Sequence, residues 1–331
     1  MALEINDALR NMAVSHAIGL RRLTTGTVRD IIAILDEADD DLEAQIRKAN
    51  PGTETSARLT QLLQALRYIN REVYGKVESS LSAKLLDLAL YEAEYQERSV
   101  AKVASIAMLE APTPARLLAV VTSDPFQGRI LREWAEGMEA GRYDRMRAAI
   151  RIGWLEGEGV DQIVRRLRGT KAMKYKDGIL ELSRRSAQAV VRTAVNHTSN
   201  AARQLVYEKN PDLLEGWRFV STLESNTCPI CAALDDGTVY PLGKGPQPPR
   251  HLNCRCAAAP VVKGGGATKR ITFAKWFAEQ SAEVQDDVLG PTRGKLYREG
   301  GLTLDKFADD NRVYTLDELK RREPLVMRSA S

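Results

Sequence analysis

The sequence predicts a mainly α-helical protein with one small β-hairpin. Aromatic residues make up only 6% of the 331 residues, while the chain is 44% hydrophobic and 28% charged. This balance favours helices over a sheet-rich sandwich. Long segments place apolar residues three or four positions apart, which is the spacing of one helix face. All four cysteines lie between positions 228 and 256, so one short stretch differs from the helical remainder.

Residues 1–50 are predicted to form two helices or one broken helix. The break is expected near Thr24–Thr27, where a hydroxyl can cap a new helix and Gly26 eases a turn. Apolar residues then recur at helical spacing, at Ile31, Ile34, Leu35, Leu42 and Ile46. Asn50-Pro51-Gly52 is expected to end this segment, because a residue before proline is disfavoured in the helical region.

A second long helix is predicted from about residue 56 to 110. Its apolar stripe consists of Leu59, Leu62, Leu66, Ile69, Val73, Val77 and Leu81. A helix of this length needs a neighbour to cover its apolar face, either the N-terminal segment or another subunit. Residues 1–111 are therefore interpreted as a long antiparallel helical hairpin and a docking region, with no cluster of catalytic residue types.

Two closely spaced prolines, Pro112 and Pro114, mark the best domain boundary. Beyond them we expect short helices punctuated by glycines, namely Gly128, Gly141, Gly153, Gly157, Gly159 and Gly169. A regular helix should follow from about 180 to 208, with an inward face formed by Val190, Val191, Val195 and Ala202. Residues 217–220 alternate in polarity and predict a strand.

The cysteine-rich stretch, residues 227–256, has the spacing of a metal site. Cys228 and Cys231 are two residues apart, His251 and Cys254 repeat that gap, and Cys256 follows. Thiolates and an imidazole suit a tetrahedral zinc ion, Zn²⁺. Asp-Asp-Gly at 235–237 and a Pro/Gly-rich segment at 241–249 suggest a zinc-stapled β-hairpin that brings His251 back over the first cysteine pair. This element would complete an α-rich domain over residues 112–262.

Five candidate ligands compete for four positions. We favour Cys228, Cys231, His251 and Cys254; the set with Cys256 in place of His251 is the alternative, and a vestigial site of packed thiols is another. A catalytic zinc would need an open position and a general base, for which Glu224, Asp235 and Asp236 are nearest in sequence. The aspartates are better explained as a turn, and no metalloprotease or deaminase signature occurs. We therefore expect no enzymatic activity and no catalytic residues. The alternative function is a zinc-dependent hydrolase or nuclease acting on DNA or cell wall.

The remaining residues, 263–331, are predicted to be a linker and a short helical tail. Lys263–Gly266 should be a flexible linker, followed by an amphipathic helix around Trp276 and Phe277. Gly290-Pro291 should break it, and Thr315 should cap a last helix.

Charge is distributed unevenly along the chain, although its net value is only +4. Residues 24–54 hold eight acidic and three basic side chains, whereas residues 142–209 hold fifteen basic and seven acidic ones. The densest basic run is a candidate contact for double-stranded DNA, with a solvated loop as the alternative; it comprises Arg165, Arg166, Arg168, Lys171, Lys174 and Lys176. We expect no membrane span and no secretory leader, because charges interrupt every apolar run. The cysteines should then stay reduced, which favours a metal site over disulfides.

Several ordered motifs resemble the phage Mu F-like minor head protein family, also called phage head morphogenesis proteins. The motifs are PFQGRILREW at 125–134, IRIGWLEGEGVDQIVRRLRG at 150–169, VVRTAVNHTSNAAR at 190–203, the strand at 217–220 and the TCPIC…HLNCRC stretch. The likeness runs from about 112 to 262, is weaker in the tail, and does not extend to the N-terminal helices. The HLNCRC ending, with two prolines ahead of it, is the most specific feature.

The resemblance implies a structural minor capsid protein of a tailed phage or prophage. Such a protein would bind the portal and other capsid proteins, act in head assembly and in genome packaging or ejection, and be present in several copies per virion. It would be located in the capsid interior or at the portal vertex, and in the host cytoplasm during assembly. Arg192 and Thr193 are typical positions of the family, and we expect them to tie their helix, which also carries His197, to the zinc-bearing hairpin.

Overall fold

The computed structural model describes residues 4–49, 56–106, 108–266, 272–309, 312–324 and 326. Within these residues the chain forms eleven α-helices and one three-stranded antiparallel sheet, which confirms the mainly α fold class. The helices are α1 (Ile5–Ala49), α2 (Ser56–Ala104), α3 (Pro114–Thr122), α4 (Leu131–Leu155), α5 (Val160–Arg168), α6 (Leu180–Lys209), α7 (Pro229–Leu234), α8 (Phe273–Ala278), α9 (Ala282–Leu289), α10 (Pro291–Arg298) and α11 (Leu316–Arg322). The strands are β1 (Leu214–Val220), β2 (Val239–Tyr240) and β3 (Ala257–Val262).

The chain packs as two compact units that are discontinuous in sequence. The first unit contains Met1–Arg21, Leu88–Val120 and Asn196–Ser331, and the second contains Arg22–Asp87 and Val121–Val195. Three long helices, α1, α2 and α6, contribute residues to both units. The division into residues 1–111, 112–262 and 263–331, and the role given to each segment, stay predictions.

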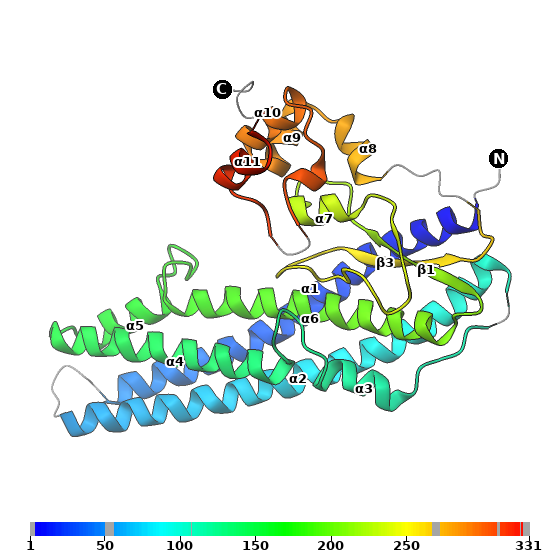
Figure 1. Cartoon of the computed structure of the whole chain (residues 1–331). Helices are drawn as coiled ribbons and strands as arrows, with labels where there is room; N and C mark the ends of the chain where they lie inside the picture. Colours follow the sequence, from blue (N-terminus) through cyan, green and yellow to red (C-terminus); the bar gives the residue numbers. More distant parts are fainter. Residues whose placement is uncertain are drawn as a thin grey trace. The chain divides into compact units, whose positions relative to one another are not determined.

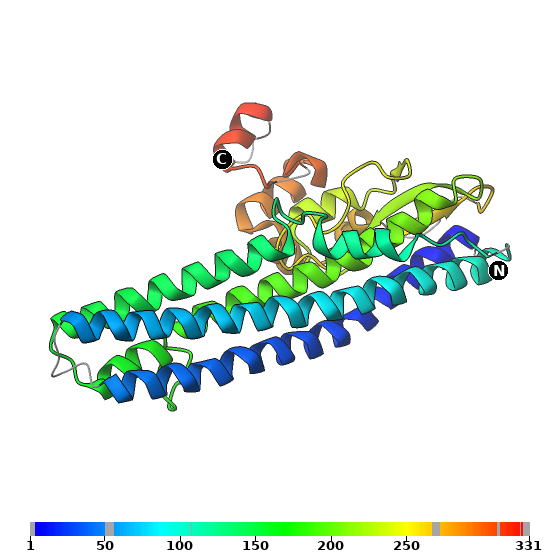
Figure 2. The ribbon, with the colours of Figure 1, turned by 90° about the horizontal axis from the view of Figure 1, so that it is seen from below.

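In the second unit, α1 and α2 form the predicted antiparallel hairpin. Both views show their parts side by side (Figure 1 and Figure 2). Their apolar faces share one core with α4, α5 and the start of α6; it includes Leu42, Ile46, Leu62, Leu66, Met146, Ile150, Ile163, Leu167 and Leu180. The predicted stripe of α2 thus faces inward because its period of three to four residues matches the helix.

A buried cluster of charged side chains connects α1, α4 and α6 beside this core. The carboxylate of Asp39, on α1, is buried and pairs with Arg142 of α4 and Arg184 of α6. Burial raises the pKa of Asp39, and the two guanidinium groups oppose that shift. A buried carboxylate without such partners would be strongly destabilising, so these contacts specify which helix faces meet.

The predicted break near Thr24–Thr27 is wrong, because α1 runs without interruption from Ile5 to Ala49. Thr27 is buried, and its hydroxyl donates to the carbonyl of Leu23 one turn earlier, at 3.0 Å. The Thr27 hydroxyl, which was expected to cap a new helix, therefore makes its hydrogen bond to the backbone of the same uninterrupted helix. Asn50-Pro51-Gly52, the predicted stop, lies outside the described residues.

The glycines at 141 and 153 do not divide the chain into short helices, since both lie inside α4. Gly153 is required for packing: a Cβ there would come within 2.7 Å of the Ile163 side chain on α5. Gly169, by contrast, does end a helix, and its φ of 87° lies in the left-handed region that glycine adopts readily.

The sheet of the first unit has the order β2-β1-β3. Trp217 of β1 pairs with Tyr240 on one side and Pro260 on the other. Its ring is fully buried and its indole N–H donates to the carbonyl of Lys244 at 2.9 Å, so burial leaves no unsatisfied donor. The predicted strand at 217–220 is confirmed as part of β1.

The tail helices contribute most of a small hydrophobic core. It contains Phe273, Phe277, Leu289, Leu296, Phe307 and Leu319, among others. α9 and α10 meet at Gly290-Pro291, and Thr315 and Glu318 form a capping box at the start of α11. The predicted flexible linker at 263–266 is instead a turn held by Asn6, whose backbone N–H donates to Gly265 and whose side-chain amide donates to Gly266.

None of the helices in the described part of the chain is both long and apolar enough to cross a membrane.

Candidate metal centre

The first cysteine pair is positioned by the N-terminus of α7. Cys228 is the N-cap residue, with an extended backbone, and its Sγ accepts a hydrogen bond from the backbone N–H of Cys231 at 3.5 Å. Pro229 occupies the first turn, where a missing N–H is harmless. The gap of two residues therefore presents both sulfur atoms from a single helical turn. The Asp-Asp-Gly segment joins this helix to β2, so the first arm of the predicted hairpin is a helix.

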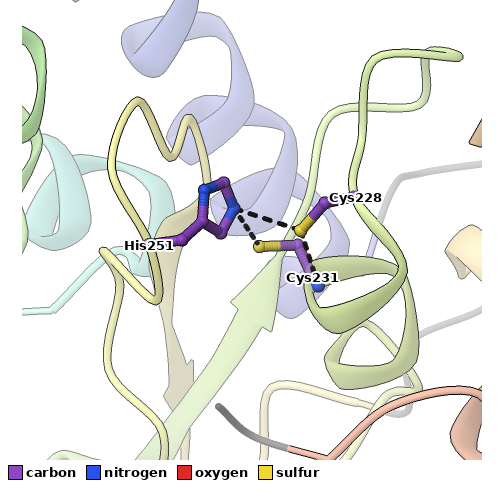
Figure 3. Close-up of side chains that lie close together, drawn as sticks. All are labelled: Cys228, Cys231 and His251. Atoms are coloured by element: carbon purple, nitrogen blue, oxygen red, sulfur yellow. Dashed lines mark hydrogen bonds between the residues drawn. The ribbon is translucent and has the colours of Figure 1, made fainter. Parts of the chain in front are cut away.

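His251 lies over this cysteine pair, in the loop that precedes β3. Its Nε2 is 3.1 Å from Sγ of Cys228 and 3.3 Å from Sγ of Cys231 (Figure 3). Its Nδ1 is 2.8 Å from the carbonyl oxygen of Leu252, which can accept the Nδ1 proton. That hydrogen bond orients the ring so that Nε2 faces both sulfur atoms.

The second cysteine pair approaches from the same loop. Cys254 and Cys256 are buried, and Sγ of Cys254 lies 3.8 Å from Sγ of Cys231. The ligand atoms form two groups of three, and within each group all atoms lie within 4.8 Å of one another. One group contains Cys228, Cys231 and His251, and the other contains Cys231, Cys254 and Cys256. Cys231 belongs to both groups. The structure thus brings all five predicted ligand candidates together.

The separations suit a tetrahedral ion. Zn–S bonds of about 2.3 Å at tetrahedral angles place two sulfur atoms about 3.8 Å apart. The Cys231–Cys254 separation of 3.8 Å has this value. The donor set of thiols and one imidazole is the set that zinc prefers, so the residues fit the ion.

The side chains of the cluster shift one another's pKa values. A hydrogen bond from Cys231 lowers the pKa of the Cys228 thiol to about 5, although burial opposes the shift. Hydrogen bonds to Cys228 and Cys254 raise the pKa of His251 to about 11. Contact with Cys231 likewise lowers the pKa of Cys254, whereas the pKa of Cys231 is raised. Cys228 and Cys254 thus favour the thiolate, the form in which a cysteine binds a metal, whereas Cys231 and Cys256 favour the neutral thiol.

Two asparagines of α6 hold the backbone behind the cluster. The side-chain amide of Asn196 donates to the carbonyl of Cys256 at 3.0 Å, and that of Asn200 does so at 3.3 Å. Asn200 also accepts a hydrogen bond from the N–H of Ala258 at 2.8 Å. Sequence reasoning missed both residues. Their spacing of four on one helix, next to apolar inward positions, is the signal that could have found them.

The matching family is described as "Phage Mu protein F like protein", and its model covers residues 144–259. Residues 144–259 are a phage Mu protein F-like domain. This confirms the resemblance drawn from the motifs, over a narrower range than the 112–262 expected. No curated protein and no solved structure gave a match. The family supports a role in phage head morphogenesis, with capsid-related partners.

The F-like domain contains all five ligand candidates and also the three carboxylates considered as general bases. Asp235 is buried and accepts hydrogen bonds from Arg10 and from the N–H and hydroxyl of Ser221. Asp236 accepts from the N–H and hydroxyl of Thr238, which confirms the predicted turn. Glu224 pairs with Arg21 and Arg255. Each carboxylate thus has a structural role.

The predicted basic run of the F-like domain divides into two groups. Arg166 pairs with Glu156 and Glu158, and Arg168 pairs with Asp40 and Glu43. Arg165, Lys171, Lys174 and Lys176 have exposed side chains, and the three lysines lie in the loop between α5 and α6. The positive charge available to a polyanion is therefore smaller than the sequence suggests.

Asn196 and Asn200 link α6 to the segment that carries Cys256, and the link predicted for Arg192 and Thr193 stays a prediction. Arg192 is exposed, and the hydroxyl of Thr193 donates to the carbonyl of Ala189 in its own helix, at 2.7 Å. Asn196 and Asn200, about one and two turns further along α6, contact Cys256, which directly precedes β3, and Ala258 of β3. His197 contributes neither of these contacts.

Proposed function

We propose that this chain is a structural minor capsid protein of a tailed phage or prophage, associated with the portal vertex and acting in head assembly and in genome packaging or delivery. The F-like family match carries the proposal, because head morphogenesis is the role that the family supports. The same proposal places the protein in the virion, at the portal vertex or in the capsid interior, and in the host cytoplasm during assembly.

The cysteine cluster serves in this proposal as a structural zinc site. Structural zinc sites use four protein ligands, whereas catalytic ones leave a position open for water or substrate. Five donor groups form two overlapping groups of three here, and Cys231 is common to both. The carboxylates nearest in sequence are committed to arginine, serine and threonine partners. These contacts favour a closed site, and so a protein without catalytic residues.

The ligand set that the contacts favour is Cys228, Cys231, His251 and Cys254. Nε2 of His251 is in contact with two sulfur atoms, and Cys254 contacts both Cys231 and His251. Cys256 belongs only to the group with Cys231 and Cys254 and is buried like Cys254. It then packs behind the metal as an apolar thiol, and remains the alternative fourth ligand.

The other segments receive roles consistent with this. Residues 1–111 would dock on the portal or another capsid protein through the exposed side of their helices, and several copies would surround one vertex. The exposed lysines of the α5–α6 loop would contact packaged double-stranded DNA through phosphates, without reading bases.

Co-purification with a portal tests the function. The chain is co-expressed with the portal protein encoded beside it and analysed by size-exclusion chromatography at several salt concentrations, with a portal from an unrelated phage as control. Co-elution with its own portal alone is expected. Separate elution at every salt concentration would count against portal docking.

Metal analysis tests the zinc site independently. Protein purified under reducing conditions without chelator should contain about one zinc per chain, because a structural zinc binds tightly and stabilises the fold. A content below about half an equivalent would contradict the site.

A further inference from the structure

The short helix α7 depends on side chains at both of its ends. It has six residues, and a helix of that length is not stable through its own hydrogen bonds. At its N-terminus the thiol of Cys228 accepts the N–H of Cys231. At its C-terminus Asp235 is held by Arg10 and Ser221. The conformation of α7 therefore depends on the groups around it.

The same helix is also part of the hydrophobic core of the tail. Ala232, which directly follows Cys231, is 1% exposed and belongs to the cluster that contains Phe273, Phe277, Leu304 and Phe307. Leu223, five residues before Cys228, packs against the same cluster. In Figure 1, α7 lies next to the tail helices. One six-residue helix thus carries two metal-ligand candidates and part of the surface on which the tail packs.

The tail's own core is small, and Ala232 of α7 and the nearby Leu223 extend it. The tail helices α8, α9, α10 and α11 contain only six to eight residues each. A segment of this size is at the limit of what a single hydrophobic core can stabilise. Losing the contact with α7 would therefore affect the whole tail.

We propose that metal binding at the cysteine cluster and packing of the tail helices α8 to α11 on α7 are coupled through α7. The inference rests on the metal site proposed above and adds a consequence for the tail. A bound ion fixes the first turn of α7 through Cys228 and Cys231, and the fixed helix presents Ala232 to the tail core. Coupling between two sites is reciprocal, so a docked tail also strengthens metal binding. The metal state then determines how tightly the tail packs on α7.

Hydrogen–deuterium exchange of the full-length protein tests the first half of the coupling. Exchange is measured by mass spectrometry under reducing conditions, with one equivalent of zinc and after chelation. Peptides from α8 and α9 should exchange at least about fivefold faster without metal, the lower end of typical coupling factors. Peptides from α4, which lies in the second unit, serve as the internal reference and should change little. Equal tail exchange in both states overturns the coupling.

Substitutions in the tail core test the reciprocal half. Ala232→Asp places a charge in the core, whereas Phe277→Leu replaces an aromatic ring by a smaller aliphatic side chain without adding charge. At equilibrium in competition with a chelator, both should bind zinc at least about fivefold more weakly than the unsubstituted chain. Ala274→Asp, at an exposed position of α8, is the matched control and should bind zinc with the original affinity. If Ala232→Asp fails to fold, as judged by circular dichroism, Phe277→Leu carries the test. Unchanged zinc affinity in folded Phe277→Leu overturns the reciprocal coupling.

The two possible failures are distinguishable. A chain that holds no zinc overturns the metal site and the coupling together. A chain that holds one zinc, but whose tail exchange does not respond to chelation, overturns the coupling and leaves the metal site intact.

Discussion

Arg10 and Asp235 form a buried ion pair between residues 225 positions apart. Nη2 of Arg10 lies 2.9 Å from Oδ1 and 3.0 Å from Oδ2 of Asp235, and the two side chains are only 5% and 2% exposed. Asp235 immediately follows α7, so this pair joins the first helix of the chain to the helix of the first cysteine pair. The N-terminal segment is thus an integral part of the compact unit that holds the metal centre.

Removing Arg10 should destabilise this unit strongly. Arg10→Met leaves the Asp235 carboxylate buried without its cation, which costs about 3–5 kcal/mol. The free energy of unfolding is measured by urea titration at pH 7. Arg98→Met, which breaks the exposed pair with Glu94, is the matched control and should cost less than about 1 kcal/mol. Equal costs for the two variants would contradict a role for the buried pair.

Acid should weaken the fold through Glu92. This carboxylate is fully buried; burial alone would raise its pKa, but Arg203 and His16 outweigh burial and hold the pKa at about 2, below the ordinary value of 4.5. Because the pKa in the folded chain is the lower one, the stabilisation is complete above about pH 4.5. It is lost as the pH falls from 4.5 towards 2. The shift corresponds to about 3 kcal/mol.

Glu92→Gln tests this by comparison with the unsubstituted chain at each pH. The variant should be less stable at pH 7, where it leaves Arg203 buried and unpaired, and the difference should shrink towards pH 2. The comparison at equal pH removes the acid sensitivity of the metal site, which both chains share. Glu94→Gln, at an exposed position of the same helix, is the control. A difference that stays constant with pH would show that Glu92 does not titrate in this way.

Single substitutions in the cysteine cluster should distinguish the residues that bind zinc from the residue that only packs beside it. Cys231→Ser should lower zinc affinity most, because Cys231 belongs to both groups of ligand atoms. Cys228→Ser, Cys254→Ser and His251→Ala should each lower the zinc content measurably, whereas Cys256→Ser should retain about one zinc per chain. Zinc content and competition with a chelator measure the series. Retention by His251→Ala together with loss in Cys256→Ser would identify the four-cysteine set.

Neutralising the loop lysines should weaken binding to double-stranded DNA. The triple variant Lys171→Gln, Lys174→Gln, Lys176→Gln removes three exposed charges, so the slope of log affinity against log salt should fall by up to about three. The control Arg166→Gln, Arg168→Gln removes charges that already pair with carboxylates, and should change the slope less. Equal effects of the two variants would show that the lysine loop is not a specific contact for DNA.

Much of the fold and of the metal centre could be predicted from local sequence. The stripe from Leu59 to Leu81 predicts its helix because side chains three and four apart share one face. The paired gaps of Cys228, Cys231, His251 and Cys254 predict a shared metal because thiolates and imidazoles are its preferred donors. Thr315 and Glu318 predict their capping box because both hydrogen bonds are made within four residues.

The tertiary structure decided what depends on partners distant in sequence. The glycines at 141 and 153 look like helix ends, but packing against α5 keeps Gly153 inside a helix. Asp235 and Asp236 read alike in the sequence, yet one bonds locally to Thr238 and the other to Arg10 at the opposite end of the chain. The link from α6 to Cys256 and the start of β3 is made by Asn196 and Asn200 because their positions on the folded helix reach that backbone. Local spacing determines which residues can share a face or a turn, whereas burial and long-range pairing determine which of them do.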